Sequence, residues 1–212
     1  DDVQSLKNRP GEILVKKDSK YGVLDSLGNL KIKLEYDSIV GDEYCTEKYG
    51  YGQTGYIVMK KTKSGNMYGY LDYTGEQYLK TEFESITRVF KYDDDNIYLI
   101  AMSNGKKGVY KNKEEIIEKK YQNITFADNS DLFVVKRNSK YGIYNMNGKL
   151  ILDTKYTNYS LAEKYISVTT TDDKKELYDV NGNKLSSLDY VTIQPSGNTD
   201  CYIAIDEDGY YS

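Results

Sequence analysis

The chain has 212 residues and a net charge of −4, and 29% of its residues are charged. This acidic balance argues against a nucleic-acid surface, which needs a basic field, and no apolar run reaches the ~18 residues of a membrane-spanning helix. Histidine is absent, which excludes Ser-His and Cys-His catalytic pairs and imidazole metal ligands.

The aromatic residues are mainly tyrosine, with 24 copies against four phenylalanines and no tryptophan. Tyrosine can bury its ring while its hydroxyl reaches water or a partner, and with Ile, Val and Leu it is typical of sheets. Alanine, the best helix former, is scarce. The composition therefore predicts an all-β protein.

The first predicted strand is the apolar run 13–15, and the segment YGVLDSLGNLKIKLEYDSI that follows contains a hairpin. Within it, Asp25 and Gly28 form an Asp-x-x-Gly pattern, in which the carboxylate caps the turn and the glycine takes a left-handed conformation. A longer strand follows the turn, and a short fourth strand is expected between Tyr36 and Ile39.

The same order of elements recurs along the chain, which predicts a repeat architecture. A fixed aromatic residue followed by an aliphatic residue three positions later is most simply a core layer shared by all units. The aligned segments begin at Tyr21, Tyr68, Lys107, Tyr141 and Lys175, their aromatic positions are Tyr36, Phe83, Tyr121, Tyr156 and Tyr190, and the leading strands are predicted at 13–15, 56–59, 97–100, 132–135 and 165–168, with a sixth at 202–205.

Two of the repeat intervals are longer than the rest. The first position of each segment is Gly22, Gly69, Gly108, Gly142 and then Glu176, at intervals of 47, 39, 34 and 34 residues. The excess predicts two inserted loops, one between Val40 and Gly55 and one between Thr87 and Asn96.

Four tyrosines crowd the first insertion. Aromatic rings in a loop on a rigid scaffold are common binding groups, because they give contact area at low entropic cost. The alternative is a loop that packs its own rings. The predicted partner-binding residues are Tyr44, Tyr49, Tyr51 and Tyr56.

The insertion also spells GYGQTG, which has the G-x-G-x-x-G pattern of phosphate-binding loops. Such a loop opens a helix whose N-terminus meets the phosphate, whereas the repeat register places a strand directly after Gly55. A kinase-type loop would also need a catalytic Asp in a His-Arg-Asp context. The pattern therefore does not predict a nucleotide site, and we expect no cofactor.

Two acidic clusters, at 93–96 and 206–209, lack the spacing of an EF-hand calcium loop. Both lie where the repeat predicts turns, so we expect solvated turns and no metal site, with calcium binding as the alternative. The two cysteines, Cys45 and Cys201, could form a disulfide if the ends of the chain meet, which would suit an exported protein. Two free thiols are the alternative.

The repeat resembles the WG (KWG) repeat family of bacterial proteins. That family's pattern is an aromatic-Gly step, a strand, an Asp-x-x-Gly turn and a strand ending in Tyr-Asp-x-Ile, which matches the sequence from Lys20 to Ile39 well. Tyrosine replaces the family's tryptophan throughout, and Lys107 and Lys175 take the aromatic position in the third and fifth units. The resemblance implies a binding or scaffolding module.

We predict one repeat domain over residues 1–212, with units at about 11–40, 56–87, 97–125, 132–160 and 165–194 and a partial unit at 201–212. Repeated antiparallel units bury their faces by stacking, as a propeller-like ring of five to six small blades or as an open solenoid-like, superhelical array of hairpin repeats. Residues 1–10 show no hairpin and 202–212 repeat only a first strand, so a strand shared between the two ends is expected to close a ring.

The leading functional hypothesis is a non-enzymatic module that binds a protein or glycan partner at the cell surface of a bacterium. It is expected to be a monomer without a transmembrane segment. What precedes Asp1 is left open, with a lipid anchor as one alternative. The alternative is a carboxylate-dependent glycoside hydrolase or lyase on a propeller scaffold, since that chemistry needs two acids and no histidine.

Overall fold

The computed structural model describes residues 2–6, 9–42, 55–91, 94, 96–185, 192–195 and 202–205. All regular structure in these ranges is β-strand, which confirms the predicted all-β class. The same ranges hold no helix long and apolar enough to cross a membrane. The chain divides into two compact units, Asp1–Lys119 and Lys120–Ser212, which are described separately. The single repeat domain stays a prediction.

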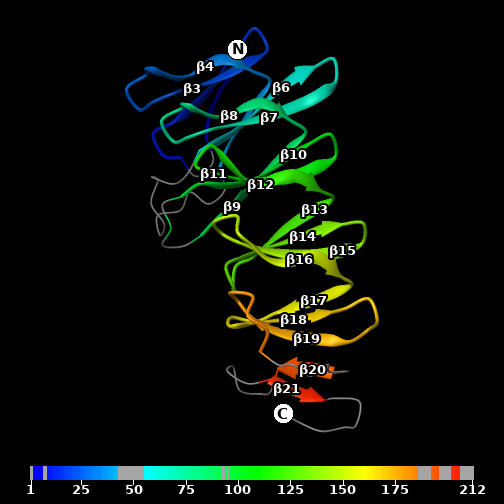
Figure 1. Cartoon of the computed structure of the whole chain (residues 1–212). Coiled ribbons are helices and arrows are strands. Elements are labelled where there is room, and N and C mark those ends of the chain that lie inside the picture. The colour runs from blue at the N-terminus through cyan, green and yellow to red at the C-terminus, as the bar shows by residue number, and fades with distance from the viewer. Residues whose placement is uncertain are drawn as a thin grey trace. The chain divides into compact units, whose positions relative to one another are not determined.

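The first unit contains three four-stranded antiparallel sheets (Figure 1). Their strand orders are β1-β2-β3-β4, β5-β6-β7-β8 and β12-β11-β10-β9. The strands are β1 (Asp2–Ser5), β2 (Ile13–Lys17), β3 (Lys20–Leu24), β4 (Leu30–Tyr36), β5 (Ser38–Gly41), β6 (Tyr56–Thr62), β7 (Gly65–Leu71), β8 (Gln77–Phe83), β9 (Ser85–Val89), β10 (Tyr98–Ser103), β11 (Lys106–Lys111) and β12 (Glu114–Tyr121).

The second unit contains sheets of the same kind. In its described residues the orders are β13-β14-β15-β16, β17-β18-β19 and β20-β21. The strands are β13 (Asn123–Ala127), β14 (Leu132–Arg137), β15 (Lys140–Asn145), β16 (Leu150–Tyr156), β17 (Asn158–Leu161), β18 (Tyr165–Thr169), β19 (Lys175–Asp179), β20 (Thr192–Pro195) and β21 (Tyr202–Ile205).

The short fourth strand of each repeat pairs with the first strand of the next repeat. β5 follows β4 after a single residue, Asp37, yet it pairs with β6 and begins the next sheet. The Asp37 amide donates to the Met59 carbonyl at 2.8 Å, and Glu84, Gln122 and Thr157 make the equivalent bond. The fourth strand was predicted; each predicted sequence unit ends with it, and in the structure it pairs in the following sheet.

The first sheet obtains its fourth strand from the N-terminal residues. β1 pairs antiparallel with β2, from Asp2 opposite Lys16 to Ser5 opposite Ile13. It fills the place that a preceding repeat would otherwise fill. The first sheet therefore has four strands without one from the other end of the chain, and both the shared strand and the choice between ring and open array stay predictions.

The predicted Asx turns are confirmed. In the first repeat, the Asp25 carboxylate accepts from the Leu27 and Asn29 amides at 2.9 and 2.8 Å, and Gly28 has φ 84°. Hydrogen bonding from Asn29 lowers the pKa of Asp25. The third repeat instead has a two-residue turn, Asn112-Lys113, with positive φ at both positions. The shorter turn accounts for this segment being one residue shorter than the other four.

The first glycine of each segment lies where β3-type and β4-type strands approach most closely. Tyr21 pairs with Tyr36 and Val23 with Ile32, so β4 is bulged at this point. A Cβ on Gly22 would lie 2.6 Å from the Ile32 carbonyl oxygen, which is closer than atoms tolerate. The position needs glycine because of this approach.

The repeat aromatic residues form the predicted core layer between successive sheets. Tyr36 is buried among residues of the first two sheets, and Phe83 among residues of the second and third. In the second unit, Tyr156 is buried between the sheets that contain β16 and β18. Their exposed fractions are all at or below 6%, which confirms the layer at these positions, whereas Tyr190 lies outside the described residues.

Candidate functional site

The first insertion leaves and re-enters the sheet at one point. The Asp42 amide donates to the Gly55 carbonyl at 2.9 Å, so the residues on either side of the loop are bonded to each other. The loop between them, with Tyr44, Cys45, Tyr49 and Tyr51, lies outside the described residues. The predicted contact role of these tyrosines stays a prediction, as does the disulfide between Cys45 and Cys201.

Tyr56 is the one predicted contact residue that the structure describes, and it is fully buried. Its hydroxyl donates to a Glu12 carboxylate oxygen at 2.5 Å and accepts from Arg9 at 3.1 Å. The Arg9 guanidinium also lies 4.0 Å from the centre of the Tyr56 ring. The expectation that Tyr56 offers its ring to a partner is corrected, because β6 turns this side chain into the core.

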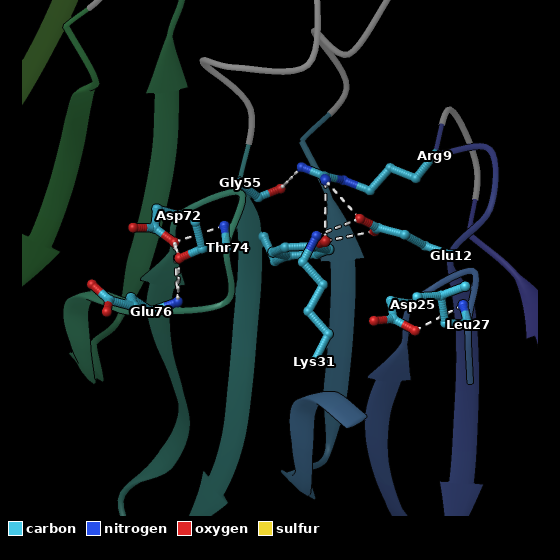
Figure 2. Close-up of polar contacts among 10 residues, drawn as sticks. Arg9, Glu12, Asp25, Leu27, Lys31, Gly55, Asp72, Thr74 and Glu76 are labelled. Carbon is cyan, nitrogen blue, oxygen red and sulfur yellow. Dashed lines mark hydrogen bonds and ion pairs between the residues drawn. The ribbon is translucent and has the colours of Figure 1, made fainter. Parts of the chain in front are cut away.

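A charged cluster surrounds Tyr56 and fixes the end of the insertion (Figure 2). Arg9 donates to the Gly55 carbonyl at 2.9 Å, and Lys31 lies 2.6 Å from the Glu12 carboxylate. The neighbouring pocket of about 120 Å³ is small, and Arg9, Glu12 and Lys31 in its lining bond to one another. These contacts indicate an anchor for the loop rather than a ligand site.

The second insertion is joined to the first at its root. Arg88, at the end of β9, lies 3.3 Å from the Asp42 carboxylate, and both side chains are almost fully buried. Arg88 also donates to the carbonyls of Val89 and Tyr98. A buried carboxylate and guanidinium need such partners, since an uncompensated charge in the core is costly.

Tyr70 completes this buried cluster. Its hydroxyl donates to Asp42 at 2.9 Å. Burial raises the pKa of Tyr70 well above its ordinary value, and the adjacent Asp42 carboxylate adds to the effect. The phenol therefore stays protonated at neutral pH and continues to donate.

A groove of about 240 Å³ lies directly over this cluster. The groove is lined by β5 and β9, each of which is an edge strand of its sheet, and by one side chain from β6. Its walls are mainly aliphatic, and Val40 at its rim is 51% exposed. The lining residues are Val40, Gly41, Asp42, Ile57, Ile86, Thr87 and Arg88.

The sequence did not reveal Asp42 and Arg88 as partners. Each is a charged residue two or three positions after the aliphatic residue of its repeat, Ile39 or Ile86, where an insertion begins. A charged residue so close to a core position indicates a buried charge, and charged residues are rarely fully buried unless they are paired. The two residues are 46 positions apart, so no local pattern in the sequence indicates that they pair.

Where the structure describes the first acidic cluster, it is a local turn. Asp94 accepts from the Asn96 amide and from the Tyr98 hydroxyl, each at 2.9 Å. The cluster at 206–209 lies outside the described residues. Among the residues described, no group of three His, Cys, Asp or Glu side chains could hold a metal ion.

Comparison with known proteins identifies the repeat. Residues 111–141 match the model of the family described as WG containing repeat. This stretch of the chain therefore resembles a WG repeat. The matched stretch begins at the end of β11 and reaches β15, so it contains the step at which a WG repeat passes its fourth strand, β13, to the next sheet. No curated protein sequence matches the chain.

Several solved structures are weakly similar. The crystal structure titled as the eukaryotic initiation factor has 12% identity and a TM-score of 0.47, covering 89% of this chain, which spans 55% of that chain. The WD40 β-propeller domain of Doa1 has 12% identity and a TM-score of 0.32, with 96% of this chain and 74% of that chain covered. BBS1N in complex with ARL6DN has 12% identity, a TM-score of 0.33 and coverages of 94% and 73%.

Proposed function

We propose that this WG-repeat chain is a non-enzymatic binding module and that the groove between β5 and β9 receives an extended segment of a partner protein. The observation that carries the proposal is the groove itself, which is built at the roots of both insertions. Loops set on a rigid scaffold are where binding functions concentrate. We also propose that the protein is located at the surface of a bacterial cell.

The groove has the features that an extended peptide uses. β5 and β9 are edge strands, so the backbone N–H and C=O groups on their outer side point away from the sheet. Such groups are suited to pairing with an added strand. Ile57 and Ile86 supply an apolar wall. The buried Asp42 and Arg88 bond to each other beneath it, which keeps the floor rigid.

Substitution of Val40 tests the groove. Val40 is exposed at the rim, so Val40→Asp should leave stability within about 0.5 kcal/mol while placing a charge on the apolar wall. Val3→Asp is the matched control, because Val3 is also an exposed valine on a strand that ends a sheet in the same unit.

A displayed library of random peptides, selected on the intact chain, provides the probe. Selected peptides should bind Val40→Asp at least tenfold more weakly and Val3→Asp equally well. Equal binding to both variants would refute the groove. A chain that selects no peptide but binds a glycan array would favour the glycan partner, and hydrolysis of any glycoside in a substrate panel would favour the glycosidase alternative.

A further inference from the structure

The fifth repeat departs from the others at one position in the second unit. Glu176 stands where the four preceding repeats have glycine. At each of those glycines, an added Cβ would come within 2.5 to 2.9 Å of the neighbouring strand. A glutamate side chain cannot lie under a strand packed in that way. The positions compared are Gly22, Gly69, Gly108 and Gly142.

The hairpin that begins with β19 is described as far as Leu185. In the described residues after β19, Lys184 forms a bridge with Tyr178, the Asp179 amide donates to the Asn183 carbonyl at 3.0 Å, and the Leu185 amide donates to the Leu177 carbonyl at 2.9 Å. A recess of about 240 Å³ lies at this place. Its lining residues are Lys155, Tyr156, Thr170, Thr171 and Glu176.

Hydrogen bonds fix the orientation of the Glu176 carboxylate. Lys184 Nζ lies 2.8 Å from Oε1, and the Tyr178 hydroxyl donates to Oε2 at 2.8 Å. Tyr156 and Tyr178 hydroxyls are 3.1 Å apart. Because Tyr178 gives its only proton to Glu176, Tyr156 is the donor in that bond.

The protonation states follow from these contacts. Partial burial acts to raise the pKa of Glu176, but hydrogen bonds from Lys184 and Tyr178 outweigh it, and the pKa lies below its ordinary value. Burial raises the pKa of Tyr156. At neutral pH the recess therefore contains an ionised carboxylate and neutral phenols.

The recess offers more acceptors than its own donors use. An ionised carboxylate has about four acceptor positions, and two on Glu176 are taken by Lys184 and Tyr178. The Tyr156 and Thr170 hydroxyls donate to Tyr178 and to the Lys174 carbonyl, which leaves their oxygens able to accept. A complementary ligand must therefore donate several hydrogen bonds.

Charge and volume narrow the class of ligand. Lys155 and Lys184 outnumber the one carboxylate, so a cationic ligand is disfavoured. The volume of about 240 Å³ lies just below the range of about 300–1,000 Å³ for drug-sized ligands, which suits one small ring. We propose that this recess binds a single neutral sugar ring, two of whose adjacent hydroxyls donate to the Glu176 carboxylate and the Tyr156 oxygen.

Saturation-transfer NMR on the intact chain tests this site, with the methyl glycosides of glucose, galactose, mannose and N-acetylglucosamine as probes. At least one should bind with millimolar affinity, and Glu176→Gln and Glu176→Gly should each weaken it at least tenfold. Glu176→Gly restores the residue of the other repeats and should fold, which far-UV circular dichroism checks. Glu115→Gln, which alters an exposed Glu-Lys pair in the first unit, should leave sugar binding unchanged.

Three results would overturn the proposal: no transfer to any of the four sugars, unchanged binding in both Glu176 variants, or tighter binding of methylammonium than of the sugars. The site is separate from the peptide groove proposed above. Val40→Asp should leave sugar binding intact, so failure of one proposal is distinguishable from failure of the other.

Discussion

Replacing Gly108 by alanine should destabilise the first unit more than replacing Gly142 destabilises the second. A Cβ on Gly108 would lie 2.6 Å from the Ile117 carbonyl oxygen and 2.9 Å from the Lys119 amide nitrogen, both backbone atoms of β12. Because these are backbone atoms, β12 itself must move to relieve the two close contacts. At Gly142 the nearest atom is the Thr154 hydroxyl, at 2.5 Å, which can rotate away, and the nearest backbone atoms, Thr154 Cα and N, lie at 3.0 Å, farther than those at Gly108.

Overpacking of this kind costs about 1–3 kcal/mol, and the gain from restricting the unfolded chain, about 0.4–1 kcal/mol, applies equally to both positions. We therefore expect a loss of about 2 kcal/mol for Gly108→Ala and about 1 kcal/mol for Gly142→Ala. Urea unfolding followed by circular dichroism gives the free energies, and hydrogen exchange of β11 and β15 assigns them to the units.

Gly105→Asn is the control, because nothing lies within 4 Å of a Cβ at Gly105 and asparagine tolerates its φ of 66°. It should change stability by less than about 0.5 kcal/mol. Equal losses at Gly108 and Gly142, or a larger loss at Gly142, would refute the argument from backbone contact.

Two further predictions concern the turns and the tyrosine layer. Asn145→Ala removes side-chain bonds to two turn amides, each at 3.0 Å, and should cost about 1 kcal/mol in urea unfolding. Asn145→Asp should be nearly neutral, and similar losses for both would contradict the capping role. Burial, with smaller effects from Glu35, raises the pKa of Tyr36 to about 12 from 10. Its contribution to stability should therefore be intact below pH 10 and lost as the pH rises towards 12; Tyr36→Phe should abolish that loss, and a phenol titrating at 10 in a spectrophotometric titration would contradict it.

The sequence predicted the strands, the Asx turns and the aromatic layer because each depends on local chemistry that recurs in every repeat. Asp25 and Gly28 determine a turn within a few residues, and Tyr36 repeats with the period of the sheets. β1 was missed because all four of its residues are exposed. Its pairing is made by backbone groups, which leave no apolar alternation in the sequence.

The candidate sites were less accessible to prediction because they depend on contacts between distant residues. Tyr56 looked like a loop residue beside an insertion, yet it is the first residue of β6 and lies in the core. Asp42 and Arg88 come together only after two sheets have packed. Glu176 was visible as a departure from glycine, but its carboxylate acquires a role only through Tyr178 and Lys184.

The transfer of each fourth strand to the following sheet affects how such chains gain and lose repeats. A duplication or deletion of one whole sequence repeat still leaves four strands in the sheets around it. The fourth strand of the repeat before the change pairs with the first strand of whichever repeat now follows it. The first sheet is the exception, because β1 pairs with β2 and serves as its cap. A shortened chain that begins at β6 would lack both β5 and a cap, and it would expose an unpaired edge prone to association with other chains.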